Sequence, residues 1–195
     1  MNRRRAVRIA IGVLLVAVLT WGVNRGLERL VAPPAPASSA ATPAAAPPPA
    51  VPHITATLFY AATDGQALVP VRREVPLAEG VVPQGREILT MQLQAAPAPY
   101  LSAIPAGTML RAFYVTQRGD AFVDLSAEVS SQHPGGSFTE LLTVYAIVNA
   151  VTANLPTVQR VQILIDGKEA ETLAGHVDLR RPLARDVTLV REPET

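Results

Sequence analysis

The chain has 195 residues, no cysteine and a formal net charge of +1. The missing cysteine excludes a disulfide framework, a cysteine-ligated metal centre, a cysteine nucleophile and a lipid-modified cysteine. Six of the 17 basic residues and one of the 16 acidic residues fall within residues 1–31, which leaves 11 basic and 15 acidic residues in the rest. That mildly acidic remainder argues against nucleic-acid binding, which requires a basic surface.

An apolar run of eighteen residues, Ala6 to Val23, follows a basic head and contains one charge, Arg8. As a helix it would extend about 27 Å, close to the ~30 Å hydrocarbon core of a bilayer. The arginines before it predict a single-pass anchor in the cytoplasmic membrane, with the N-terminus inside and the rest of the chain exported to the extracytoplasmic, periplasmic side. A cleaved signal peptide is the alternative, but no small-x-small cleavage site follows the run directly.

Residues 32–52 contain 8 Pro and 9 Ala among 21 residues, a composition that builds no core. An extended polyproline-type chain of this length would reach roughly 65 Å. A spacer that holds a domain away from the membrane and a disordered connector both remain open. The sequence therefore divides into a head, anchor and flank (1–31), a linker (32–52), and a folded domain with its tail (53–195).

The folded domain alternates strand and helix patterns. Strands are expected at 54–61 and 68–75, with Pro70 favouring an edge position or the start of the pairing. A helix at 83–94, strands at 109–116 and 121–125, a helix at 137–154 and a strand at 158–165 with a short return after Asp166-Gly167 follow. The order β-β-α-β-β-α-β-β predicts an α+β fold, in which two helices pack on one face of a small antiparallel or mixed sheet.

The three histidines lack the spacing of metal ligands. None has a ligand-type partner two to four residues away. His53, at the linker boundary, and His133, in a loop, are expected on the solvated surface. His176 follows Gly175 in a turn, where a hydrogen-bonded structural role is expected.

Two acids and two serines are the remaining candidates for catalysis. Asp124 and Glu128 could form the carboxylate pair of a glycosidase, but acids at the ends of exposed strands are ordinary. There is no Gly-x-Ser-x-Gly elbow, and Ser126 and Ser137 are expected in a turn and at a helix cap.

Two further clusters have structural explanations. Gly135-Gly136-Ser137 could cradle an anion at a helix start, but it lacks the Walker lysine. Ser137 and Glu140 have the spacing of a capping box, which accounts for the motif. Arg180, Arg181 and Arg185 form a basic cluster that is either a solvated face or a partner contact. The sequence therefore predicts that the protein has no catalytic residue, cofactor or metal site and that it is not an enzyme.

Several strings nevertheless resemble one known family when they are taken together. They occur in the family's order and cover roughly Thr57 to Asp186: Ser102 to Thr108 (SAIPAGT), Val123 to Ser126 (VDLS), Gly136-Ser137 with Glu140-Leu141, Val161 to Gly167 (VQILIDG), Thr172 to His176 (TLAGH), Asp178-Leu179, and Arg180 to Leu183 (RRPL). This pattern is similar to the GerMN domain of a sporulation and spore-germination protein.

The resemblance implies a small α+β domain outside the cytoplasmic membrane, without established catalytic residues. It favours a non-catalytic module for contacts with envelope proteins, including self-assembly. A peptidoglycan-binding or amidase-regulating module is the alternative, because relatives of the domain occur fused to peptidoglycan amidases. This chain differs from the sporulation protein in having one such domain rather than two, and a predicted helical anchor rather than a lipoprotein cysteine.

Overall fold

The structure is a computed structural model that describes residues 52–192 together with Trp21. The predicted anchor and linker lie outside the described residues, apart from Trp21 and Pro52. Within the described part of the chain, no helix is both long enough and apolar enough to cross a membrane.

The domain begins with a two-stranded antiparallel hairpin. Strand β1 (His53–Ala61) pairs with β2 (Leu68–Pro76) in a continuous register from His53 opposite Pro76 to Ala61 opposite Leu68. The edge position predicted from Pro70 is confirmed, because β2 pairs with no strand except β1 within residues 52–192. Pro70 lies opposite Phe59, at a point where β2 needs no N–H group.

The other strands form a separate mixed sheet. Its order is β3 (Leu110–Val115), β4 (Asp120–Leu125), β5 (Arg160–Ile165) and β6 (Lys168–Glu169), with β7 (Leu183–Ala184) also paired to β5. The β4–β5 pair is parallel and the other pairs are antiparallel. The prediction of an α+β fold is confirmed. The prediction of a single sheet is wrong, because the hairpin remains apart from the mixed sheet.

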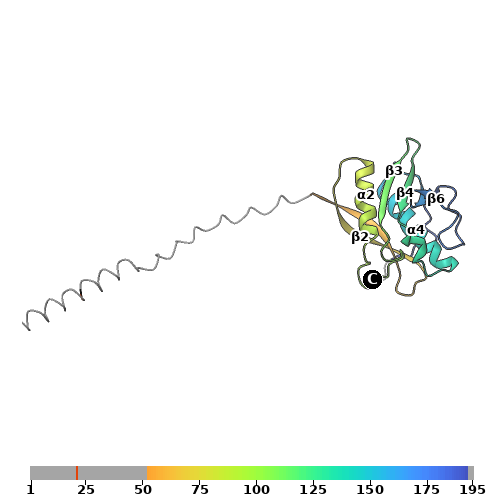
Figure 1. The fold of residues 1–195 in the computed structure, drawn as a ribbon, viewed down its shortest axis with the longest axis horizontal. Helices are drawn as coiled ribbons and strands as arrows, with labels where there is room; N and C mark the ends of the chain where they lie inside the picture. Colours follow the sequence, from red (N-terminus) through yellow and green to blue (C-terminus); the bar gives the residue numbers. More distant parts are fainter. Residues whose placement is uncertain (1–20, 22–51, 193–195) are drawn as a thin grey trace, which may run out of the picture. The chain divides into compact units, whose positions relative to one another are not determined.

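Two long helices, α2 (Val81–Gln92) and α4 (Ser137–Asn154), contact each other (Figure 1). Helix α2 also contacts β3, helix α4 contacts β5, and both contact β1. A short helix that the sequence did not predict, α3 (Glu128–Ser131), precedes α4. The hydrophobic core therefore lies where the helices meet the hairpin and the mixed sheet.

The two faces of β3 differ in burial. The structure places Phe113 in the core at 2% exposure and leaves Tyr114 outside at 59%. Gly85 of α2 lies directly against the Phe113 ring, because a Cβ atom at residue 85 would meet that ring. The close packing of α2 on β3 therefore depends on a glycine in the middle of a helix.

Side-chain amides complete the free edge of β1. The Gln92 carboxamide accepts the Phe59 N–H at 2.9 Å and donates to the Phe59 carbonyl oxygen at 2.7 Å. Asn154 makes the same pair of bonds with Thr57, at 2.8 and 2.7 Å. Because buried backbone groups need partners, these amides allow the edge of β1 to be buried against helices instead of a further strand.

Tyr60 carries a hydroxyl that has no hydrogen-bond partner among the described residues, although the residue is 1% exposed. Burial raises the pKa of Tyr60, and nearby Arg73 opposes that rise. Because an unpaired buried polar group is destabilising, we expect Tyr60→Phe to raise the free energy of unfolding by about 1 kcal/mol. Urea denaturation measures the change. Tyr114→Phe, at an exposed ring, is the control and should have no effect, and a destabilised Tyr60→Phe variant would contradict the assignment.

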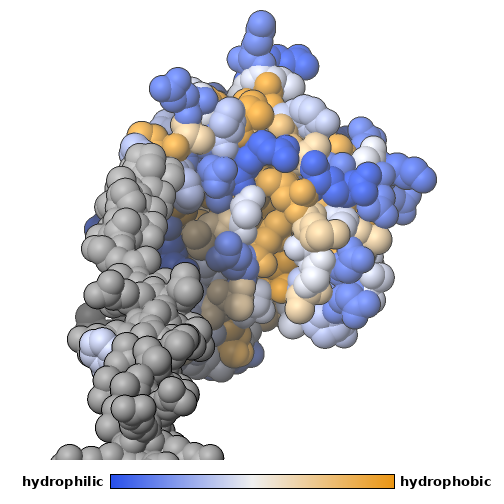
Figure 2. Space-filling model, turned by 60° about the vertical axis from the view of Figure 1, so that its left-hand side comes forward, coloured by the Kyte–Doolittle hydropathy of each residue, from blue (hydrophilic) through white to orange (hydrophobic). Residues whose placement is uncertain are grey.

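The surface of the domain is not uniformly polar. Figure 2 shows one face on which apolar residues form a band between hydrophilic ones. The large apolar residues of the folded domain that stay exposed are few: Leu77, Val81, Leu101, Met109, Tyr114 and Val187. Single exposed apolar side chains are ordinary, whereas a contiguous apolar patch marks a candidate contact surface.

Candidate functional site

A pocket of about 390 Å³ opens beside the loop that carries the SAIPA string. Residues 101–106 form one wall, and His133, Pro134 and the first turns of α4 form the other. The lining is mainly apolar, and Leu101, one of its residues, is 51% exposed. Leu101 also exchanges two backbone hydrogen bonds of 2.9 Å with Ala61 at the end of β1. The pocket wall is therefore fixed to the hairpin.

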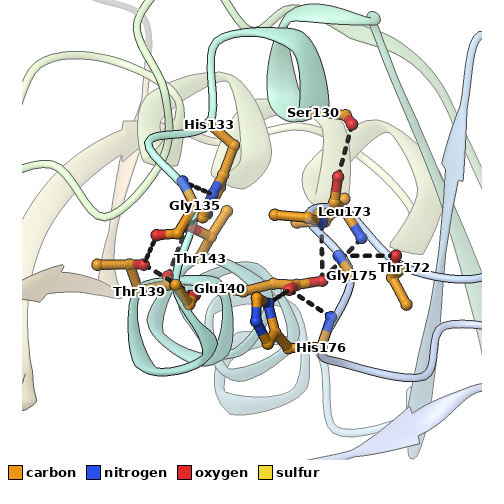
Figure 3. Close-up of polar contacts among 12 residues, drawn as sticks. Ser130, His133, Gly135, Thr139, Glu140, Thr143, Thr172, Leu173, Gly175 and His176 are labelled. Atoms are coloured by element: carbon orange, nitrogen blue, oxygen red, sulfur yellow. Dashed lines mark hydrogen bonds and ion pairs between the residues drawn. The ribbon is translucent and has the colours of Figure 1, made fainter.

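His133 lies in the wall of this pocket and contacts Gly135 and Thr143 (Figure 3). The Gly135 N–H donates to His133 Nδ1 at 3.0 Å. The ring proton is therefore assigned to Nε2, which lies 3.1 Å from Thr143 Oγ1. That hydroxyl donates to the Ala103 carbonyl oxygen at 2.5 Å. His133, expected on the solvated surface, is partly exposed, and both of its ring nitrogens have hydrogen-bond partners around the pocket.

The capping box predicted at the start of α4 is not formed. Gly136 is the N-cap residue, Ser137 is the first helical residue, and no side chain caps the helix. Glu140 points into the protein instead and is fully buried. The glycine turn moves the N-cap back by one residue, and the Glu140 carboxylate bonds to a distant loop instead of the helix start.

Those partners lie in residues 172–176, the TLAGH string (Figure 3). Glu140 Oε1 accepts the N–H groups of Leu173 and Ala174 at 2.8 and 3.0 Å. Glu140 Oε2 accepts the His176 N–H at 2.9 Å and lies 3.0 Å from His176 Nδ1. One buried carboxylate therefore holds a whole loop, and His176 has the hydrogen-bonded role expected of it.

The electrostatics of Glu140 give a pH prediction. Burial would raise the pKa of Glu140, but the backbone N–H groups of the loop and the His176 ring outweigh burial and lower it below 4.5. A lowered native pKa means that this carboxylate stabilises the fold above pH 4.5 and that its contribution is lost as the pH falls through the native pKa.

We therefore expect the protection of the amides of residues 173–176 against hydrogen exchange, taken relative to the intrinsic exchange rate at each pH, to fall in acid before that of the core strands β4 and β5. Mass spectrometry across the acid range measures this. In the Glu140→Gln variant the loop should exchange fast at every pH. Simultaneous loss of protection in the loop and in the core of the wild-type chain would contradict the local role of Glu140.

Asp124 and Glu128 do not form a pair within the described contacts. Asp124, in β4, accepts the Gly167 N–H at 2.7 Å and lies 3.3 Å from Arg111 Nε. It thereby secures the turn between β5 and β6. The pKa of Glu128 is lowered, first by a hydrogen bond from Ser126. Both acids therefore have local structural partners.

The remaining candidate residues from the sequence lie apart from one another in the structure. Ser126 Oγ accepts the Met109 N–H at 2.9 Å, as a turn residue would, and His53 is exposed at the start of β1. In the basic cluster, Arg180 binds the carboxylate of Asp178 through two nitrogens, at 2.9 and 2.8 Å. This pairing holds the pKa of Asp178 well below its usual range. Arg181 and Arg185 are exposed. Within the described residues, no group of three or more His, Asp or Glu could hold a metal ion.

Comparisons with known proteins agree with this fold. The Germane family model, described as "Sporulation and spore germination", matches residues 57–171. A putative lipoprotein from Clostridium perfringens is similar in structure, with a TM-score of 0.50 and 20% identity over 71% of this chain and 91% of that one. No curated protein matches the chain in sequence.

Two structures of the sporulation protein GerM from Bacillus subtilis are also similar. Its first GerMN domain gives a TM-score of 0.50 at 18% identity, over 68% of this chain and 96% of that one. Its tandem GerMN domains give a TM-score of 0.51 at 17% identity, over 69% of this chain. This chain spans 46% of the tandem structure.

Proposed function

Because the chain belongs to the Germane family of sporulation and spore-germination domains, we propose that it is a membrane-tethered envelope protein whose folded domain binds other proteins without catalysing a reaction. The tether is the predicted anchor at residues 6–23, which would place the domain outside the cytoplasmic membrane. A similar solved structure is described as a putative lipoprotein, which supports an envelope location.

The binding role rests on a contrast between the polar side chains of the domain, which are engaged in structural hydrogen bonds, and its pocket. Glu140, Asp124 and His133 all hold loops in place through hydrogen bonds. The pocket beside residues 101–106 is open and mainly apolar. A site of this kind selects an apolar side chain by shape, because its polar groups already have partners.

Leu101 lies in the wall of the pocket, so a crosslinker at this position can detect a bound partner. A photo-crosslinking amino acid at position 101 of the full chain, in its native membrane, should give a discrete adduct with a second copy or another envelope protein. The same amino acid at Val187, which is also exposed, is the control and should give none. Absence of an adduct at position 101 would contradict the proposal.

A cell-wall ligand is the alternative occupant of this site, and sedimentation with purified peptidoglycan tests it. The proposal expects the full chain in detergent to remain in the supernatant. Sedimentation of the wild-type chain, lost in a Leu101→Arg variant, would replace the protein partner with peptidoglycan. The Val187→Arg variant controls for a nonspecific effect of the added charge.

A further inference from the structure

The outer edge of strand β2 is open along part of its length. Thr57 of β1 turns its N–H and C=O groups toward Asn154 of α4, away from β2. In an antiparallel pair, two residues directly opposite either bond to each other or both turn outward. Arg72 lies opposite Thr57, so its backbone groups point away from β1, and those of Glu74, two residues further along, do the same. Among residues 52–192, no strand other than β1 pairs with β2.

This open edge is short, because it is closed at both ends. At the start of β2, Leu68 makes two backbone hydrogen bonds of 2.8 Å with residues 189–191. Pro70 comes next on the same edge and has no N–H group to continue that pairing. Pro76, which also lacks an N–H group, ends the strand. The open edge is therefore limited to the two outward-facing residues between the prolines.

The side chains of these two residues carry opposite charges. Arg72 and Glu74 lie on the same face of the strand, because successive side chains alternate, and both are exposed. Glu74 Oε1 accepts the Thr55 hydroxyl at 2.9 Å, but neither side chain has an ion-pair partner within the described part of the chain. A strand with this pattern is complementary to a second copy of itself.

We propose that β2 pairs with β2 of a second copy of this chain, antiparallel and centred on Arg73. In this register the outward N–H groups of each copy donate to C=O groups of the other, and Arg72 of each copy lies opposite Glu74 of the other. Opposite charges in this position stabilise a strand pair. A shift of two residues in either direction would place Arg72 opposite Arg72 or Glu74 opposite Glu74, which is destabilising. The inference goes beyond the proposed function, because this edge is a different surface from the pocket.

Arg73 limits the strength of this pairing. It lies on the other face of β2, where its Nη2 atom is 3.8 Å from Met91 Sδ of α2 in its own copy. Two copies of Arg73 meet at the centre of the pairing, and like charges that lie opposite each other are destabilising. The contact is therefore weak and reversible, and it depends on the ion pairs at positions 72 and 74.

A single introduced cysteine tests the register, because the chain has none. At the centre of the pairing, the two Cα atoms lie about 4.5 Å apart, within the range that a disulfide spans. Two copies of residue 71 would be separated by roughly 14 Å at ~3.4 Å per residue. Both positions are partly exposed. Arg73→Cys in the full chain, oxidised in cells that express it, should give a disulfide-linked dimer in severalfold higher yield than Val71→Cys. Equal yields would overturn the inference.

Charge variants test the cause of the pairing. In the Arg73→Cys chain, Arg72→Glu or Glu74→Arg alone should lower the dimer yield severalfold, because like charges then lie opposite each other. The double variant Arg72→Glu/Glu74→Arg places opposite charges together again and should restore the yield. A double variant that stays as low as the single variants would overturn the inference.

Competition tests whether the unmodified strand takes part. Wild-type chain co-expressed in excess, at a constant amount of the Arg73→Cys chain, should lower the dimer yield, and excess Arg72→Glu chain should lower it less. Equal effects would overturn the inference. A dimer that forms only when the chain ends at Glu192 would also overturn it, because residues 193–195 would then cover the edge.

The two proposals fail separately. A disulfide-linked dimer through position 73 without an adduct at position 101 would support the edge pairing and remove the role of the pocket. An adduct at position 101 without a dimer through position 73 would overturn the edge pairing alone.

Discussion

Glu140→Ala is expected to lower the free energy of unfolding by about 1.5–3 kcal/mol, as loss of hydrogen bonds to a buried charged group does. The substitution leaves the N–H groups of Leu173, Ala174 and His176 without their acceptor. The His176 ring loses its partner at the same time. Urea denaturation of the domain, monitored by circular dichroism, measures the loss.

The control for this prediction lies in the same loop. Glu171 is exposed, so Glu171→Gln removes a charge nearby without removing a buried acceptor and should change stability by no more than about 0.5 kcal/mol. The Glu140→Gln variant keeps one acceptor oxygen and should lie between the two. A Glu140→Ala variant as stable as Glu171→Gln would contradict the role given to the carboxylate.

Gly85→Ala is expected to destabilise the domain by about 1–3 kcal/mol, as overpacking of a core does. In the interior of an exposed helix the same change stabilises by about 1 kcal/mol, so the sign of the effect is diagnostic. Here the new Cβ would collide with Phe113 Cε1 and lie 2.8 Å from Phe113 Cζ. Either α2 must move away from β3 or the Phe113 ring must leave its place in the core.

Two further variants identify the cause of this effect. Thr90→Ala, at an exposed position of α2, should be neutral or slightly stabilising. In the double variant Gly85→Ala/Phe113→Leu the smaller side chain leaves room for the methyl group, so the two costs should be less than additive. A stabilised Gly85→Ala variant would contradict the close packing of α2 on β3.

The elements of the fold were largely predictable because they depend on local patterns. The helix predicted at 137–154 agrees with α4, and the hairpin strands agree within one residue at each end. Asp166-Gly167 forms the predicted turn, with Asp166 at a φ of 50°. Proline and glycine spacing and apolar periodicity are sufficient for such assignments.

The long-range polar contacts were not predictable in this way. Glu140 matches a capping box by spacing, but its partners lie 33 to 36 residues further along the chain. Gln92 and Asn154 look like ordinary helix residues, and only the folded structure brings them to the edge of β1. The hydrogen bonding of His133 was not predictable either, because its partner Thr143 lies on another element. Hydrogen bonds between distant segments leave no local period in a sequence.

The central claim is that the pocket surface, and not an acid or a histidine, carries the function. Complementation of a deletion strain tests it most directly, with the envelope defect of the deletion as the readout and immunoblots to confirm equal protein levels. Leu101→Arg should fail to complement, whereas Glu128→Gln and His176→Gln should restore the wild-type phenotype. Full complementation by Leu101→Arg, together with failure of Glu128→Gln or His176→Gln at normal protein level, would contradict the claim and indicate catalysis instead.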